Sequence, residues 1–254
     1  MRKSMFKSIL STSLIVSCMG LSSVSFAAVT IDRTRAIFNG SQESLTIAVS
    51  NKNKKLPYLA QAWMENSEHE KVSSPFLVLP PVQRLEAGQT SQIRIKGTEQ
   101  LKQLPQDKES LFYFNVREVP PKSLKPNVMQ IALQSKIKLI YRPQSIELNP
   151  TEMMNNPWQE KLVLIKQNGS VIAKNPTPYY TTILGVSKSK QEPMAENFSA
   201  QLIEPFGQVT LPVSSEWLGN TPVFTYINDY GGRPQMQFQC QANECRTVKM
   251  PEKE

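Results

Sequence analysis

The sequence offers few arrangements of residues that could perform catalysis. His69 is the single histidine, and it lies in a run of mostly polar and charged residues, 65–71, which is typical of a solvated surface position. Without a second histidine, neither a histidine-based metal site nor a Ser-His-Asp triad has its parts near His69. The stretches 168–170 and 230–232 have the composition of turns, and no phosphate-binding glycine motif occurs. The composition does not exclude a hydrolase that uses two carboxylates, although no pair of Asp or Glu residues stands out in the sequence.

The cysteines indicate an oxidising compartment. Cys18 lies in an N-terminal stretch that we expect to be cleaved off as a signal peptide. Cys240 and Cys245 then remain as an even pair. A disulfide between them would close a turn between two strands or staple the end of one strand. Because the loop is short, it would contribute less than the roughly 3 kcal/mol of a 15-residue loop. Zinc is the alternative, but two thiols without a nearby histidine are a poor ligand set.

The N-terminus has the pattern of a cleaved signal peptide. Arg2, Lys3 and Lys7 precede an apolar stretch at 9–21, and the small residues Ser25 and Ala27 follow. We therefore expect residues 1–27 to be removed after export. A membrane anchor is the alternative, but a spanning helix needs about 20 apolar residues. We expect no membrane insertion of the mature chain.

The charge of the chain argues against a nucleic-acid partner. The net charge is +8, and the predicted leader holds three of the basic residues and no acidic ones. A basic protein that leaves the cytoplasm rarely meets nucleic acid. Its positive surface is expected to meet anionic groups on other proteins or to aid solubility.

Short strands separated by Pro, Gly and Asn run through the whole mature chain, which predicts β-sandwiches of the immunoglobulin type. Arg142-Pro143 ends the longest strand pattern, and residues 144–157 follow as a hinge and an irregular segment. We place the domains at 28–146 and 147–254. The predicted strands are 45–50, 58–64, 76–79, 92–96, 111–119, 129–141, 161–165, 170–172, 179–186, 208–211, 223–227 and 236–240.

One long motif resembles a known family. Residues 104–121 (LPQDKESLFYFNVREVPP) form a polar turn, a strand and a double-proline stop. This run resembles, position by position, the signature of the periplasmic pilus-assembly chaperones. Further stretches are similar to the same family, namely 28–38, 56–63, 80–85, 127–143, 175–180 and 226–234. The resemblance implies an all-β protein with two Ig-like domains in an L, an interdomain cleft, no cofactor and no catalysis.

The same resemblance implies a mechanism. A pilus subunit is an Ig fold that lacks its last strand, and the chaperone lends a strand to complete it. Here the donor residues would be Met129, Ile131 and Leu133, which share one face at a period of two. The resemblance assigns Arg35 and Lys138 to the site that anchors the subunit's terminal carboxylate. Lys138 has the opposite parity to the donor residues, so a bulge or a strong twist would be needed to bring it to their face.

Further site residues follow from the resemblance. Glu109, Arg142 and Asp229 match an interdomain salt bridge, and Pro80 and Pro81 match a proline lid. The implied partners are pilus subunits, both pilins and adhesin, and an outer-membrane usher, with the periplasm as the compartment.

Two other functions compete with a chaperone. A structural pilus subunit is also exported and Ig-like, but it carries a donor extension at its N-terminus and a penultimate aromatic residue. This chain starts its first strand at Ala28 and ends in the charged run 249–254. A periplasmic β-sandwich hydrolase is the weaker rival, because the chain lacks a nucleophile motif.

Overall fold

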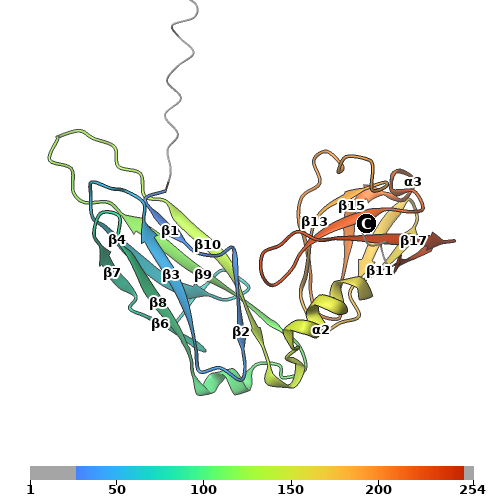
Figure 1. The fold of residues 1–254 in the computed structure, drawn as a ribbon, viewed down its shortest axis with the longest axis horizontal. Coiled ribbons are helices and arrows are strands. Elements are labelled where there is room, and N and C mark those ends of the chain that lie inside the picture. The colour runs from blue at the N-terminus through green and yellow to red at the C-terminus, as the bar shows by residue number, and fades with distance from the viewer. Residues whose placement is uncertain (1–26, 249–254) are drawn as a thin grey trace, which may run out of the picture.

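The computed structural model describes residues 27–248, and within them most of the regular secondary structure is β-strand, packed around two separate hydrophobic cores. The predicted leader lies outside the described residues, except for Ala27. Figure 1 shows two β units that meet at one end, beside helix α2, and diverge away from it. The prediction of a β protein with two units is therefore confirmed.

The first unit has two sheets with the core between them. The four-stranded sheet has the order β1 (Val29–Ile31), β3 (Ser44–Asn51), β8 (Thr90–Gly97) and β6 (Phe76–Leu79). The other sheet runs β2 (Arg35–Asn39), β10 (Gln134–Arg142), β9 (Ser110–Val119), β4 (Tyr58–Glu65) and β5 (Lys71–Val72), with β7 (Val82–Leu85) also on β4. Strands β2 and β10 pair in parallel, and the other pairs of both sheets are antiparallel.

The alternation of apolar and polar residues explains how these strands bury one face. In β8, Ile93 and Ile95 are completely buried, whereas Arg94 and Lys96 between and beside them are exposed. Aromatic rings then fill the core at the end near η1 (Glu99–Gln103), where Phe76 packs edge-on against Phe38 at 5.0 Å between ring centroids.

The second unit is one continuous ladder of eight strands that curls around its own core. The order along the ladder is β14 (Gln201–Ile203), β13 (Thr181–Ser187), β16 (Val223–Ile227), β17 (Gln235–Gln241), β18 (Glu244–Val248), β11 (Val163–Gln167), β12 (Ser170–Lys174) and β15 (Gln208–Ser214). A one-turn helix, α3 (Ser215–Leu218), follows β15. The two edge strands β14 and β15 are joined by a tight turn, so the ends of the ladder return to each other.

The connection between the units contains short helical turns where the sequence predicted an irregular segment. These are η2 (Gln144–Ile146), α2 (Pro150–Asn155) and η3 (Trp158–Lys161). The N-terminus of helix α2 is capped. The side chain of Asn149 accepts a hydrogen bond from the Glu152 N–H, and Pro150 has no N–H that needs a partner.

One strand prediction was wrong in its extent, and several strands were missed. The strand predicted over 129–141 begins only at Gln134. The neighbouring strand β9 ends at Val119 and continues into Pro120 and Pro121, which have no N–H to donate. Leu133 still accepts the Glu118 N–H, but residues 128–132 have no ladder to join. Strands β2, β5, β7, β14 and β18 were not predicted. The residues of β18 (Glu244–Val248), for example, are mostly polar.

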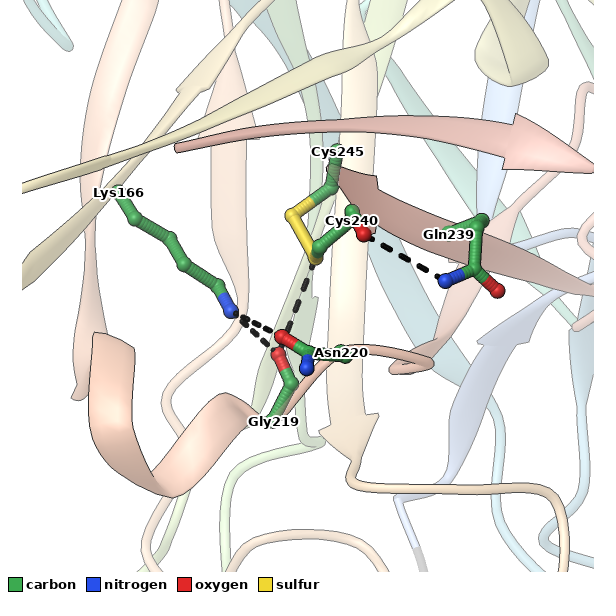
Figure 2. Close-up of a disulfide and its surroundings, with 6 residues drawn as sticks. All are labelled: Lys166, Gly219, Asn220, Gln239, Cys240 and Cys245. Carbon is green, nitrogen blue, oxygen red and sulfur yellow. Dashed lines mark hydrogen bonds between the residues drawn. A yellow bond between two sulfur atoms is a disulfide. The ribbon is translucent and has the colours of Figure 1, made fainter. Parts of the chain in front are cut away.

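The disulfide prediction is confirmed. Cys240 in β17 and Cys245 in β18 are directly paired across the hairpin and joined through their sulfur atoms (Figure 2). Cys245 is completely buried, and the neighbouring Lys166 ammonium donates to the Gly219 carbonyl at 2.6 Å. Both thiols are used in this bond, so the zinc alternative does not apply. Residues 27–248 contain no group of three or more His, Cys, Asp or Glu side chains arranged to hold a metal ion.

Removing the disulfide should cost little stability. The cysteines are only five positions apart, and a loop of that size restricts the unfolded chain by about 2 kcal/mol. We expect the double substitution Cys240→Ser and Cys245→Ser to lower the free energy of unfolding by about that amount in urea titrations. A loss above 4 kcal/mol, or a free thiol in protein trapped before reduction, would contradict this account.

Candidate functional site

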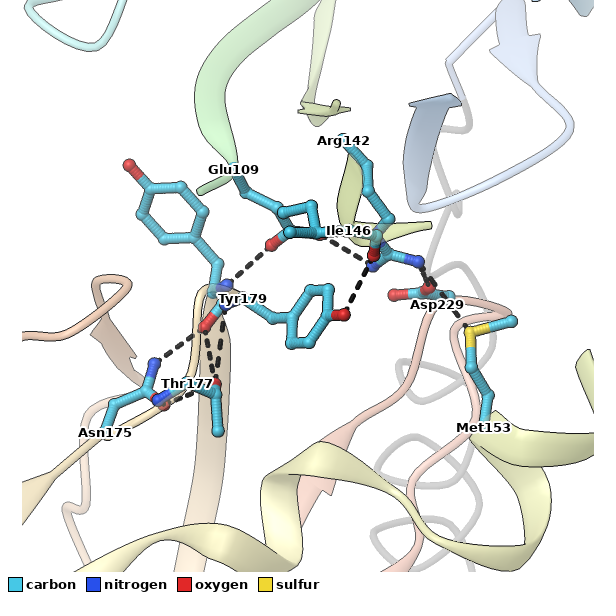
Figure 3. A network of polar contacts seen from close by, with 9 residues as sticks. Glu109, Arg142, Ile146, Met153, Asn175, Thr177, Tyr179 and Asp229 are labelled. Carbon is cyan, nitrogen blue, oxygen red and sulfur yellow. Dashed lines mark hydrogen bonds and ion pairs between the residues drawn. The ribbon is translucent and has the colours of Figure 1, made fainter. Parts of the chain in front are cut away.

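Arg142 connects the two units through two carboxylates. It ends β10 of the first unit, and its side chain is only 3% exposed. Its Nε and Nη2 lie 2.8 and 2.6 Å from Oε1 of Glu109, which precedes β9. Its Nη1 donates to Oδ2 of Asp229 at 2.8 Å, and Asp229 lies on the turn between β16 and β17 of the second unit. Figure 3 shows the guanidinium between these two acids.

Glu109 makes further contacts between the two units. Its other oxygen, Oε2, accepts the Tyr180 N–H at 2.6 Å, and its own N–H donates to the Pro178 carbonyl at 2.9 Å. The loop that presents these groups is held by Asn175, whose side-chain amide donates to the Tyr179 carbonyl at 2.6 Å. The sequence motif at 175–180 therefore supplies backbone groups to the junction as well as side chains.

Aromatic rings enclose the guanidinium of Arg142. The centroids of the Trp158 and Tyr179 rings each lie 5.1 Å from its central carbon, which is the geometry of a cation–π contact. The Tyr179 hydroxyl donates to the Ile146 carbonyl at 2.8 Å, so the ring is fixed against the connection between the units. Nothing in the spacing of the sequence indicated that Trp158 takes part.

Burial sets the titration behaviour of this network. Burial raises the pKa of Glu109 to about 7, against the charge of Arg142 and the Tyr180 N–H, which lower it; the charge of Asp229 raises it further. Burial lowers the pKa of Arg142, but the charges of Glu109 and Asp229 outweigh burial, so that pKa is raised. Arg142 therefore stays charged, and Glu109 is the group that can gain a proton near neutral pH.

The structure brings Arg35 and Lys138 together. They are direct neighbours in the parallel ladder of β2 and β10, on the outer face of the sheet. Arg35 is 8% exposed, and its Nε has no hydrogen-bond partner among residues 27–248. Neither side chain forms an ion pair with a carboxylate in that range. Two adjacent basic groups of this kind are suited to bind one anion.

Burial also shifts the pKa values of this basic pair. It lowers the pKa of Arg35, against the more distant charges of Asp229 and Glu109. Burial and then the charge of Arg35 lower the pKa of Lys138. A bound carboxylate would relieve the repulsion between the two cations, so the charged forms of both side chains would favour its binding.

The predicted donor residues project beyond the end of the first unit. Met129, Ile131 and Leu133 are 87%, 69% and 40% exposed, so exposure falls toward the start of β10. The loop that carries them extends past the sheets in Figure 1. They have the same parity as Ile137 and Leu139, which are buried in the core of the first unit. The apolar face of β10 therefore continues outside its own core.

The opposite parity of Lys138 needs no distortion of the strand. The register between β10 and β9 is continuous from Gln134 to Tyr141, without a bulge. Odd-numbered residues of β10 face the core, and even-numbered ones, including Lys138 and Arg142, lie on the outer face. The basic pair and the apolar donor row are thus on opposite faces of one regular strand.

The other predicted positions lie apart from this cluster. Pro80 and Pro81 are exposed and connect β6 of one sheet to β7 of the other, and the Pro81 carbonyl accepts the Ala62 N–H at 2.8 Å. His69 is an exposed side chain whose ring packs against Tyr113 at 4.5 Å between centroids. In the described part of the chain, no helix has the length and apolar character to cross a membrane.

The raised pKa of Glu109 predicts a pH dependence of stability. A carboxyl whose pKa is about 7 when folded and 4.5 when unfolded stabilises the fold fully below pH 4.5 and loses this contribution as the pH rises to about 7. Relative to Glu109→Gln, the wild type should therefore lose unfolding free energy over this window, on the order of 3 kcal/mol. Urea titrations at several pH values measure this difference. A relative gain with rising pH would mean that Arg142 keeps Glu109 ionised.

Known families and proteins match nearly the whole described chain. A family model described as "Pili and flagellar-assembly chaperone, PapD N-terminal domain" matches residues 28–147, and "Pili assembly chaperone PapD, C-terminal domain" matches residues 157–238. The chaperone protein PapD of Escherichia coli is 49% identical over 88% of this chain and 91% of its own length. The chaperone protein PmfD of Proteus mirabilis is 40% identical over 87% of each chain.

Solved structures give the same result. The periplasmic chaperone SfaE superposes with a TM-score of 0.65 at 30% identity, covering 82% of this chain and 98% of SfaE. The SafB chaperone, in complex with the SafA pilin of Salmonella enterica, gives a TM-score of 0.69 at 25% identity over 86% of this chain and 99% of the matched chain. These matches confirm the predicted fold class of two Ig-like sandwich domains. The chain belongs to the PapD-like family of pilus-assembly chaperones.

Proposed function

We propose that this chain is a non-catalytic periplasmic chaperone that captures pilus subunits by lending them the segment 128–134 as a strand. One observation carries the proposal. The row Met129, Ile131 and Leu133 continues the apolar face of β10 into solvent, where it has no core of its own to enter. Exposed apolar rows of this kind mark interaction surfaces, and an alternating row with free backbone groups is suited to add a strand to another sheet.

The chemistry of the partner follows from the segment. A groove that accepts alternate side chains must be apolar at its floor and must present strand edges to the backbone. A subunit that lacks its last strand has such a groove. The SafB relative, which is seen with the SafA pilin, supports pilins as the class of partner. We include both pilins and tip adhesins among the subunits.

The basic pair, Arg35 and Lys138, would anchor the C-terminus of the subunit. The C-terminal carboxylate of a subunit offers acceptors to the guanidinium of Arg35 and to the ammonium of Lys138, which lie side by side on adjacent strands. Because Lys138 lies on β10 itself, an anchored carboxylate would fix how far along this strand the subunit pairs.

Other features complete the proposal. The leader would be residues 1–27, and the domains 28–146 and 147–254. The network of Glu109, Arg142 and Asp229 would hold the angle between the domains, and Pro80 and Pro81 would act as the proline lid. The loaded chaperone would deliver its subunit to an outer-membrane usher. The function needs no cofactor and no nucleic acid.

The basic pair is tested by a matched pair of arginine variants. Arg35→Ala should abolish recovery of a subunit that co-purifies with the chaperone from the periplasm, because each charged hydrogen bond contributes on the order of 1.5–3 kcal/mol. Arg33→Ala should leave recovery normal, since Arg33 is already paired with Asp32 at 2.8 Å. Lys138→Ala should behave like Arg35→Ala. Normal recovery with both Arg35 and Lys138 replaced would refute the anchor.

The donor segment is tested by parity. Ile131→Asp would place an unpaired carboxylate in the subunit core, and it also removes apolar burial worth roughly 1.5–3 kcal/mol. Co-purification of the subunit should therefore fall at least tenfold. Gln130→Asp, one residue away and exposed, should have a much milder effect. Circular dichroism checks that both variants fold. If both variants lose capture equally, or if Ile131→Asp loses none, this strand is not the donor.

A further inference from the structure

A buried carboxylate lies where the donor segment leaves the first unit. Glu118 belongs to the core-facing row of β9, together with Phe114 and Val116, but it lies at the end of the core. It is only 5% exposed. A buried carboxylate is costly unless hydrogen bonds compensate it, so a glutamate at this position calls for an explanation.

Each oxygen of Glu118 binds a different part of the chain. Oε2 accepts the Val29 N–H of β1 at 2.9 Å, across the gap between the two sheets. Oε1 accepts the Leu133 N–H at 3.3 Å, from the last residue before β10. The side chain therefore joins the first strand of the unit to the base of the donor segment, which lie far apart in the sequence.

Leu133 is held by its carbonyl as well. The backbone N–H of Glu118 donates to the Leu133 carbonyl at 3.0 Å, so residue 118 satisfies both backbone groups of Leu133. Beyond this point Pro120 and Pro121 offer no N–H, and residues 128–132 belong to no strand. Leu133 is thus the last position at which the first unit fixes the backbone before the free part of the segment.

The apolar side chains follow the same geometry. Ile131 and Leu133 line a cavity of about 210 Å³ together with Ala28, Tyr58 and Glu118. Their side chains lie on the side of the strand that faces the core, at the open end between the sheets. A shift of the segment by one residue in register would turn its apolar side chains away from this side, because the side chains of a strand alternate.

We propose that Glu118 is a positioning residue that sets the register of the donor segment by fixing Leu133 against β1. The proposal rests on the proposed function, since it concerns which side chains meet the subunit. A carboxylate suits this role because it accepts two N–H groups at once, one on each oxygen. A glutamine of the same size has one acceptor oxygen and can serve only one of the two N–H groups.

Glu118→Gln tests the role, with Glu147→Gln as the matched control. Glu147 also uses both oxygens, accepting the N–H and the hydroxyl of Ser41 at 2.8 Å each, but it lies after the end of β10, next to the connection between the units. Amide hydrogen exchange of the free protein is measured by NMR. In Glu118→Gln the amide that loses its acceptor, Leu133 or Val29, should exchange at least tenfold faster, while Leu139 in the middle of β10 keeps its protection. Glu147→Gln should leave all three unchanged.

Subunit capture is measured on the same variants. Capture of the subunit by Glu118→Gln should be on the order of tenfold weaker. When Ile131→Asp and Gln130→Asp are each combined with Glu118→Gln, the difference in capture between them should shrink, because the register is no longer fixed. Unchanged exchange and unchanged capture, with normal capture by the wild type, would overturn the role of Glu118 alone. Faster exchange at Leu139 as well would also overturn it, since the residue would then support the whole strand. Absence of capture by the wild type would overturn the proposed function itself, and the role of Glu118 with it.

Discussion

The alternation of side chains along one strand is the constraint on which the rest of this structure depends. In β10, odd-numbered residues form the core of the first unit, and the same row continues outward as Leu133, Ile131 and Met129. Even-numbered residues carry Lys138 and Arg142 on the outer face. One strand therefore continues an apolar row beyond its own core on one face, and carries Lys138 and the guanidinium that binds the second unit on the other. A shift of one residue would exchange the two faces, so the register of this strand decides which side chains each face presents.

The basic residues on the outer face differ in whether they have an acidic partner. Arg142 is enclosed by Glu109, Asp229 and two aromatic rings, so its charge is satisfied within the protein. Arg35 and Lys138 are close to this network but lack an acid of their own among residues 27–248. Removing a partner from a buried ion pair leaves an uncompensated charge, so the network is stable only while the two units stay docked.

The sequence predicted those features that depend on local pattern. Residues 92–96 form the predicted strand, in which Ile93 and Ile95 are buried, and the even pair Cys240 and Cys245 forms the predicted disulfide, at the turn between two strands that was one of its two expected places. The family resemblance identified Arg142 and its two acids, which the structure brings into contact. Composition alone would have treated these three as independent surface charges.

The features that the sequence did not predict arise from contacts between distant backbone groups. The start of β10 depends on where the neighbouring strand meets Pro120, which a pattern within 129–141 does not contain. Glu118 reads as one polar residue in an apolar strand, and its bonds to Val29 and Leu133 appear only when β1, β9 and β10 are placed together. The Tyr180 N–H reaches Glu109 from 71 positions away. No local spacing encodes such a contact.

The central claim is that alternate side chains of the segment 128–134 enter a subunit. Thiol labelling of a chaperone–subunit complex tests it most directly, because Cys240 and Cys245 are tied in a disulfide and leave introduced thiols as the reactive ones. Ile131→Cys and Gln130→Cys would each be reacted with a maleimide before and after the subunit binds. The account predicts that binding protects Ile131→Cys strongly and leaves Gln130→Cys much more reactive. Equal protection of both, or continued reactivity of Ile131→Cys in the complex, would contradict it.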